Sequence, residues 1–388
     1  MNLFGLSSRS LLILALLDLS AAFDTIDHNI LLHRLSTSYG IHHLALSWFK
    51  SYLTNRTQTV RVGGKYSDPS VLQYGVPQGS VLGPILFVLY ASPVSDVVTK
   101  HSLLHESFAD DTELYQSASL TNVDELILRI QECISDLKTW MTLNKLQLNE
   151  DKTEFMLACP KKFLGHPSIP TSVNINNTPV PFSSTVRSLG VTLDQNLSLQ
   201  QHVTNICRSA YSELRRIGSI RQYLSEDATK TLVCAFVLSK IDYCNSLLAG
   251  LPQYLLHKLQ RIQNNAARLV LRRSNFEHIT PLLHSLHWLP ISDRINYKLS
   301  ALSFAVITGL APGYLSDLLH LYTPSRLLRS SSDTRFLQLP LVKTVSYGER
   351  SFSFQAPSAW NALPTSLRHI ESLSAFKSGL KTHLFSKL

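Results

Sequence analysis

The chain has 388 residues, of which 44% are hydrophobic and 16% are charged, so its composition excludes a disordered protein and allows two or three domains. No apolar run approaches the ~20 residues of a membrane span, so we expect no membrane partner. The five cysteines are widely spaced and form no CxxC pair, which argues against a disulfide framework and a zinc site.

The formal net charge of +9 is unevenly distributed along the chain. Residues 201–388 contain 22 Lys and Arg against 10 Asp and Glu, a balance of +12, whereas residues 1–200 contain 14 and 17, a balance of −3. A basic C-terminal half favours a polyanionic partner, although a solvated basic surface would give the same charge.

The first predicted element is a short apolar strand over residues 12–17, which ends at Asp18. The same stretch, from Arg9 through the small pair Ala21 and Ala22, also has the outline of a secretory signal peptide. Only the strand interpretation leaves Asp18 in the mature protein, so the residues that accompany Asp18 decide between the two.

Helices and hairpins are predicted to follow this strand. Helical patterns cover residues 29–37 and 43–53, and two adjacent glycines within extended arms predict a hairpin over 57–74. An apolar run at 85–90 predicts a buried helix. Two extended arms over 102–115 surround the sequence Ala-Asp-Asp-Thr, which we expect at the tip of a second hairpin.

The clearest predicted helix covers residues 123–141, where apolar residues repeat at helical spacing. Asn122 is expected to cap this helix, with Glu125 three positions further on. Strand patterns follow at 153–158, 171–176 and 186–193. Because helices and strands do not simply alternate as βαβ units, we predict an α+β fold for the first 200 residues.

From about residue 200 the pattern becomes mainly helical. Over 254–272, an apolar stripe runs beside a basic face formed by Lys258, Arg261, Arg268 and Arg272. Such a helix would pack on a core and offer cations to phosphates, although an ordinary amphipathic helix with a solvated basic edge has the same pattern. The last part of the chain is rich in Ser, Pro and Leu and has weak periodicity.

Three acidic residues lie where a metal-dependent site would need them. Asp18 ends the apolar strand, and Asp110 and Asp111 lie at the expected hairpin tip. Taken singly, an Asp after a strand is more often a cap, and adjacent Asp residues are more often a solvated turn. Mg²⁺ prefers carboxylate and phosphate oxygens, however, and a two-metal site holds its ions ~3.5–4 Å apart. A strand end beside a hairpin tip would provide such a site.

Five motifs, in order, resemble those of reverse transcriptases. They are LDLSAAFD at 17–24, YGVPQGS at 74–80 with LGP at 82–84, FADD at 108–111, LQLN at 146–149 with KTE at 152–154, and SLGV at 188–191. The sequences AFDTIDH, GVPQGSVLGPILF and LNEDKTE are similar to those of non-LTR (LINE, jockey-type) retrotransposons, as are LHWLPI and AWNALP near the end of the chain. The ordered set favours the strand over the signal peptide.

The resemblance implies an α+β fold in which a right-hand polymerase palm, an antiparallel sheet with packed helices, is followed by a helical thumb-like region. The implied domains are a palm with partial fingers over 1–200, the thumb-like region over 201–310 and a C-terminal extension over 311–388. The implied activity is that of an RNA-directed DNA polymerase, which joins a dNTP to a primer 3′-OH by two-metal nucleotidyl transfer. Its cofactor would be two Mg²⁺ ions, with Mn²⁺ as an alternative. Its partners would be an RNA template, a DNA primer and dNTPs, with the basic C-terminal half on the nucleic-acid backbone.

The resemblance also assigns the residues that carry the chemistry. Asp18 and Asp110 would ligate the metals, and Asp111 would complete the acidic cluster less directly. The backbone carbonyl of Leu19 would add a ligand. Lys152 matches a lysine near the leaving pyrophosphate, a candidate general acid; otherwise it is a surface lysine.

Four further residues match the substrate and primer sites of the family. Phe23 matches the position that rejects a ribose 2′-OH, a role compatible with core packing. Gln78 and Gly79 match a loop that contacts nucleotide and template, where glycine permits a close backbone approach. Leu189 and Gly190 match the primer grip.

The sequence departs from the family pattern in two respects. Phe108 stands where the family has Tyr, and the upstream fingers motifs and the endonuclease have no counterpart before Asp18, so we expect an N-terminally truncated copy. The alternative is a retroelement remnant that binds nucleic acid without polymerase activity. From the function alone we expect an intracellular protein, in the nucleus or the cytoplasm, that is not secreted.

Overall fold

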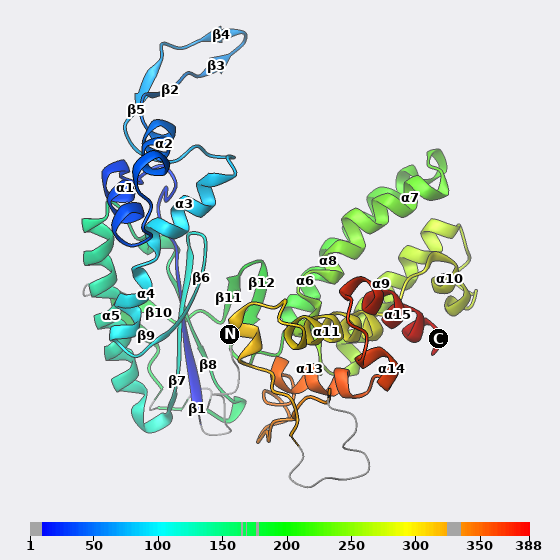
Figure 1. Cartoon of the computed structure of the whole chain (residues 1–388). Coiled ribbons are helices and arrows are strands. Elements are labelled where there is room, and N and C mark those ends of the chain that lie inside the picture. Colours follow the sequence, from blue (N-terminus) through cyan, green and yellow to red (C-terminus); the bar gives the residue numbers. More distant parts are fainter. Residues whose placement is uncertain (1–9, 164–165, 168, 176–177, 324–334) are drawn as a thin grey trace. The chain divides into compact units, whose positions relative to one another are not determined.

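The computed structural model describes residues 10–163, 166–167, 169–175, 178–323 and 335–388. The segment 1–9, which includes the basic start of the signal-peptide interpretation, lies outside the described residues. The chain divides into two compact units, the first ending at Val186 and the second beginning at Arg187. Each unit has its own core and is described by itself (Figure 1).

The first unit is built on a four-stranded sheet in the order β6-β7-β1-β8. Every neighbouring pair is antiparallel. Because β1 is paired on both edges and covered by side chains of the core, its apolar residues are buried almost without a break. The strands are β1 (Ser10–Leu17), β6 (Leu104–Phe108), β7 (Asp111–Ser119) and β8 (Glu154–Ala158).

Helices cover this sheet and complete the first core. The long helix α5 (Val123–Leu143) turns its apolar stripe, from Val123 to Met141, into that core and contacts β7 and α4. The same core holds the buried sides of α1 (His28–Thr37) and α3 (Leu82–Ala91). The unit also contains α2 (His43–Leu53), α4 (Val94–Lys100) and the two-stranded sheet of β9 (Ser172–Ile175) and β10 (Thr178–Pro181).

The segment Leu82–Lys100 corrects one expectation from the sequence. By length and composition it is apolar enough to cross a membrane, the single such segment in the described ranges. It folds as α3 followed by α4, and Leu86, Phe87 and Tyr90 are fully buried in the core of the first unit. A core helix passes the same test of length and composition, and the core packing accounts for part of the apolar character, because Ile85 and Val88 of the same helix stay exposed.

A long hairpin projects beyond α2 at one end of the first unit (Figure 1). β2 (Arg56–Gln58) pairs with β5 (Ser70–Leu72), and β3 (Arg61–Val62) pairs with β4 (Lys65–Tyr66). The two-residue turn between β3 and β4 is Gly63-Gly64, with φ of 57° and 83°, a conformation that glycine adopts without strain. The hairpin predicted over 57–74 is therefore confirmed.

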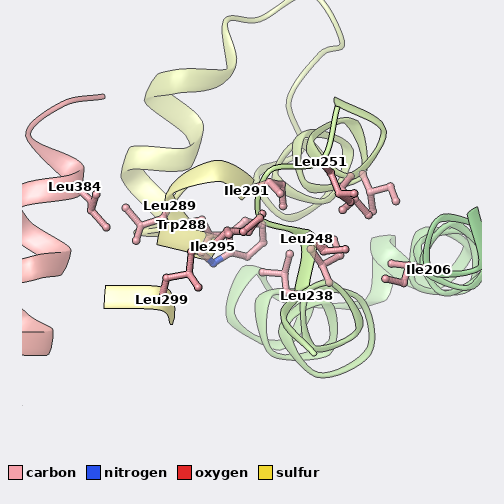
Figure 2. Packing of buried hydrophobic residues seen from close by; sticks show 14 of the residues in the cluster. Ile206, Leu238, Leu248, Leu251, Trp288, Leu289, Ile291, Ile295, Leu299 and Leu384 are labelled. Carbon is pink, nitrogen blue, oxygen red and sulfur yellow. The ribbon is translucent and has the colours of Figure 1, made fainter. Parts of the chain in front are cut away.

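The second unit is mainly helical around its own apolar core. Its central helices are α6 (Gln200–Ile220), α9 (Gln253–Leu271) and α11 (Ile291–Ile307), and Figure 2 shows Trp288, Ile291, Ile295 and Leu299 packed with their neighbours in this core. The other elements are β11 (Thr185–Ser188), which spans the division, β12 (Val191–Asp194), α7 (Glu226–Val233), a π-helical turn (Cys234–Leu238), α8 (Ser239–Asp242), α10 (Ile279–Leu286), α12 (Gly313–Ser316), α13 (Phe352–Asn361), α14 (Thr365–Arg368) and α15 (Leu373–Phe385).

The structure corrects two details of the predicted elements and adds contacts for a third. Asn122 does not cap α5 through its side chain. The strand predicted over 186–193 is two strands, β11 and β12, separated by a turn at Leu189 and Gly190, where φ is 42° and 83°. Arg268 on α9 and Arg272 directly after it each donate from one guanidinium nitrogen to backbone carbonyls within the unit.

Candidate active site

The register of the main sheet brings Asp18 beside the β6–β7 hairpin. Leu17, the last residue of β1, pairs with Thr112, so the next residue along, Asp18, comes opposite Asp111. Phe108 pairs with Asp111, which leaves Ala109 and Asp110 as the tip of the hairpin. Three carboxylates from two distant segments therefore meet at one end of the sheet.

The electrostatics of this end are those of a partly desolvated acidic cluster. Burial, followed by the charges of Asp110 and Asp18, raises the pKa of the Asp111 carboxyl above its usual range. The Oδ2 atom of Asp18 is buried and accepts no hydrogen bond. Its nearest cation is Lys152, whose Nζ lies 3.3 Å away at an exposed position. The carboxylates thus carry more negative charge than the described groups around them neutralise.

Backbone hydrogen bonds hold Lys152 near Asp18. The amide of Asn149 donates to the carbonyl of Asp18 at 2.8 Å, and the amide of Ser20 donates to the carbonyl of Gln147 at 2.9 Å. A single 3₁₀ turn, Glu150–Lys152, follows this bridge. Because Leu19 sits between these bonds, its own carbonyl faces the opposite side, towards the strand that carries Asp111.

The residues at this end fit a divalent cation by their chemistry. They supply hard carboxylate oxygens, one of them buried and without a hydrogen bond, and a backbone carbonyl on the same side. Among the described residues, however, no three His, Cys, Asp or Glu side chains are gathered in a ready-made metal site. The arrangement is thus an acidic cluster with Lys152 as its nearest counter-ion.

The segment after Asp18 crosses the loop around Gly75 at very short range. The amide of Val76 donates to the carbonyl of Phe23 at 2.9 Å, and the amide of Gly75 donates to the carbonyl of Ile26 at 2.8 Å. A Cβ on Gly75 would lie 2.9 Å from Asp24 Cα, and its φ of 82° already disfavours a side chain. Only glycine fits this crossing.

The crossing places Gln78 against Asp24 at the surface. The Nε2 of Gln78 donates to both carboxylate oxygens of Asp24, at 2.8 and 3.0 Å. The neighbouring Gly79 has a φ of 76°, and nothing lies within 4 Å of the place where its Cβ would be. The loop therefore presents an anchored amide beside an open stretch of backbone.

Phe23 links this loop to the core of the first unit. Its ring lies 5.0 Å from that of Phe87, centre to centre, and is only partly buried. The core-packing role that the sequence allowed for Phe23 is therefore present, and part of the ring remains accessible at the same end of the unit.

Sequence reasoning missed four residues that build this loop. Besides Gly75 and Asp24, they are His28 and Arg56, which both donate to the carbonyl of Gly75, at 2.8 and 3.0 Å. His28 must carry its proton on Nε2 to do so, since a carbonyl only accepts. Asp24, His28 and Gly75 lie inside the quoted motifs, whereas no local pattern marked Arg56.

The predicted primer-grip residues lie in the second unit, at the β11–β12 turn. Tyr243 donates from its hydroxyl to the carbonyl of Leu189 at 2.6 Å. Its ring lies against Gly190, where a Cβ would come 3.4 Å from Tyr243 Cε1. The turn is therefore braced from the segment after α8, a contact that the sequence did not indicate.

Comparison with known proteins identifies the fold that carries these carboxylates. Residues 7–193 match the family described as reverse transcriptase (RNA-dependent DNA polymerase). Residues 7–193 thus form a reverse transcriptase domain. The predicted α+β class is confirmed: a polymerase palm, with its antiparallel sheet and packed helices, is followed by a helical region.

The relatives to which this chain is similar are polymerases of non-LTR retrotransposons. The probable RNA-directed DNA polymerase of transposon BS from Drosophila melanogaster is 27% identical over 74% of this chain. The probable RNA-directed DNA polymerase of the X-element from the same species is 28% identical over 72% of this chain. The RNA-directed DNA polymerase of the mobile element jockey from the same species is 29% identical over 53% of the chain. The chain spans 32%, 30% and 22% of the lengths of these three relatives.

Among solved structures, the chain resembles apo telomerase from Candida tropicalis. The two are 14% identical, with a TM-score of 0.39 over 77% of this chain and 51% of the telomerase. Telomerase from the same species in complex with a fragment of telomeric RNA gives 12% identity and a TM-score of 0.36 over 72% of this chain and 49% of that one.

Proposed function

We propose that the chain is an RNA-directed DNA polymerase that extends a DNA primer on an RNA template. The observation that carries the proposal is the meeting of Asp18 with Asp110 and Asp111 at one end of the palm sheet. The family match over residues 7–193 supports the same reaction. Its substrates are dNTPs. Because it copies an RNA template, we propose that it acts inside the cell, in the nucleus or the cytoplasm.

Asp18, Asp110 and Asp111 are the proposed ligands for divalent cations, with the carbonyl of Leu19 as a further oxygen. Two bound Mg²⁺ ions, or Mn²⁺, would activate the primer 3′-OH and neutralise the charge that develops on the phosphates. The raised pKa of Asp111 and the buried oxygen of Asp18 support this role, because both are relieved by a nearby cation.

The reaction forms a bond between the primer 3′-oxygen and the α-phosphorus of the dNTP, releases the 3′-OH proton to water, and breaks the bond from that phosphorus to the pyrophosphate oxygen. Lys152 is the proposed general acid, which gives its proton to the departing pyrophosphate. Its side chain is exposed and, among the residues that the structure describes, its one ion pair is with Asp18, so it can turn towards that leaving group. Positioning and charge stabilisation supply most of the rate.

The loop around Gln78 and the ring of Phe23 are the proposed binding elements for the dNTP. Gly79 leaves open backbone for a close approach of the nucleotide or template, and Gln78 is oriented by Asp24. Phe23, braced by Phe87, is the proposed wall that excludes a ribose 2′-OH.

The second unit is proposed to hold the template–primer duplex. Leu189 and Gly190 form the proposed primer grip, and the helices up to about residue 310 act as a thumb over the phosphate backbone. The net charge of +12 over residues 201–388 supports this assignment, because backbone contacts of this kind are electrostatic and independent of sequence. Residues 311–388 are proposed as a C-terminal extension.

Primer extension on poly(rA)–oligo(dT) with Mg²⁺ and dTTP tests the proposal. The double substitution Asp110→Asn, Asp111→Asn should lower the extension rate by at least about a hundredfold, because it removes two proposed ligands and their charge. The matched control is Asp124→Asn, Glu125→Gln, which removes an equally acidic exposed pair in the first turn of α5.

Extension that persists in the Asp110, Asp111 variant would contradict the assigned site. If the unmodified chain binds the template–primer in a salt-sensitive way but extends nothing, it is the retroelement remnant that binds nucleic acid without polymerising.

A further inference from the structure

The second unit contains a cavity of about 320 Å³ that the polymerase chemistry does not use. It lies where α11 packs against α15 and faces the end of α8. The volume is at the lower end of the range for small-molecule sites. Its lining combines three cationic side chains, an aromatic and an aliphatic side chain, and two side chains with buried acceptor oxygens.

The spacing along α11 explains how this lining arises. Ile291, Ile295 and Leu299 repeat every four residues and face the core (Figure 2). The intervening residues Arg294, Tyr297 and Lys298 therefore fall on the adjacent face, which lines the cavity. The preceding segment is fixed by α9, since Gln263 donates to the carbonyl of Leu289 and Gln260 accepts from the amide of Ile291, both at 2.8 Å. The wall is thus built on well-packed elements.

The charge of the lining favours an anion. Arg294 is paired with Asp242 at 2.5 Å, which neutralises the one carboxylate in the lining. Lys298 from α11 and Lys381 from α15 add two positive charges, and His287 lies at the same cavity. A phosphate group is the anion that such a cluster of donors holds best.

The lining also offers acceptor oxygens that no described donor satisfies. Asn245 is only 5% exposed, and its Oδ1 atom has no hydrogen-bond partner. Asp242 uses Oδ2 for Arg294, while its Oδ1 is likewise buried and unpaired. Buried acceptors of this kind are costly unless a donor reaches them. A ligand with an N–H donor would remove that cost.

We propose that this cavity binds a single nucleotide whose base carries an exocyclic amino group. Lys298 and Lys381 hold its phosphate, Tyr297 and Leu289 contact the base, and the amino group donates towards Asp242 and Asn245. The same chemistry is present in a free mononucleotide and in one unstacked nucleotide of a single strand. The site lies wholly within the second unit, so it stands independently of the polymerase proposal.

Binding of AMP to the full-length chain, measured by calorimetry without dNTP or template, tests the inference. The double substitution Lys298→Ala, Lys381→Ala should weaken AMP binding by about tenfold, because two charge-assisted contacts to phosphate are lost. Lys377→Ala is the matched control, since Lys377 is an exposed lysine of the same helix α15 outside the lining. Thermal unfolding of each variant establishes that it is folded.

Two further ligands test the parts of the proposed contact. IMP, which has a carbonyl in place of the amino group, should bind several-fold more weakly than AMP, and so should adenosine, which has no phosphate. If a single-stranded oligoadenylate displaces AMP, and this displacement requires Lys298 and Lys381, the bound nucleotide belongs to a single strand. AMP binding without such competition assigns it to a free nucleotide.

Three results would overturn the inference: absence of AMP binding, equal affinity of the Lys298, Lys381 variant and the Lys377 control, or equal affinity for AMP and IMP.

Discussion

Asp111 shows what it costs to bring three carboxylates together. Its pKa is raised in the folded chain by burial and by Asp110 and Asp18, so the protonated form is favoured there. Protonated Asp111 stabilises the folded chain fully below the ordinary Asp pKa of about 4. This stabilisation of the folded chain is lost as the pH rises through the higher pKa that Asp111 has in the folded state. At neutral pH and without metal, the charge on Asp111 therefore opposes folding.

Asp111→Asn should accordingly raise the melting temperature of the chelator-treated protein at pH 7. We expect a gain of about 1–2 °C, kept small because Asp111 is exposed. The gain should vanish below about pH 4, where the native carboxyl is protonated. A melting temperature that falls at pH 7, or a gain that is independent of pH, would contradict this reading of the cluster.

Gly75 tests the crossing between the segment after β1 and the Gln78 loop. Gly75→Ala should lower the free energy of unfolding by several kcal/mol, because it adds a backbone clash to the cost of about 1–2 kcal/mol for a side chain at positive φ. Gly79 has nearly the same φ as Gly75, but no atom lies near the place where its Cβ would be. Gly79→Ala should therefore lower the free energy of unfolding only by the cost of a side chain at positive φ. Equal losses in urea unfolding would mean that the close approach contributes nothing.

At the residue scale, the sequence predicted which carboxylates would lie near one another, but not which contacts hold the surrounding loops. The motifs identified Asp18, Asp110 and Asp111, and antiparallel pairing of β1 with β7 then places them together. The Asp24–Gln78 pair and the two donors to Gly75 depend on where distant segments cross, which no local spacing encodes. The roles assigned to the three carboxylates and to the other site residues remain predictions.

At the scale of elements, periodicity predicted the long helices well and the short strands less well. The apolar repeat of residues 123–141 became α5, and the stripe over 254–272 became α9, each within two residues. β10 was missed because Pro179 and Pro181 argue against a strand, and it survives as half of a two-stranded sheet. Such short pairs depend on tertiary packing rather than on propensity.

The β11–β12 turn is the element whose support can be tested most simply. Tyr243→Phe removes the hydroxyl that donates to Leu189 but keeps the ring on Gly190, so the amides of the turn should exchange faster with solvent. The expected loss of stability is at most about 1 kcal/mol. Tyr254→Phe is the control, since that hydroxyl makes only a long contact of 3.5 Å with Gln200. Unchanged exchange at Gly190 would show that Tyr243 does not brace the turn.

At the scale of the whole molecule, acidic and basic side chains are concentrated in different halves of the chain. The first unit provides the carboxylates, and the second carries the excess of Lys and Arg. The sequence predicted a change of architecture near residue 200, and the structure divides the chain between Val186 and Arg187. Composition alone could not locate the division between the two units, because it falls within β11, ahead of the change from strands to helices.

The free cations of α9 provide the test of the proposed thumb. Lys258 and Arg261 are exposed, whereas Arg268 and Arg272 are bound to carbonyls. Lys258→Glu should weaken template–primer binding and reduce the slope of log affinity against log salt by about one. Lys377→Glu makes the same change of charge on α15 and should alter the slope much less. Identical slopes for the two variants would remove α9 from the nucleic-acid surface.

The number of Mn²⁺ ions bound by the chain tests the central claim most directly. We would measure it by electron paramagnetic resonance with poly(rA), a dideoxy-terminated oligo(dT) primer and dTTP, comparing the unmodified chain with Asp18→Asn and with the control Asp124→Asn. The account predicts about two ions for the unmodified chain and the control, as a two-metal centre requires, and at least one fewer for Asp18→Asn. If Asp18→Asn binds as many ions as the unmodified chain, the carboxylates at this end of the sheet are not the metal centre.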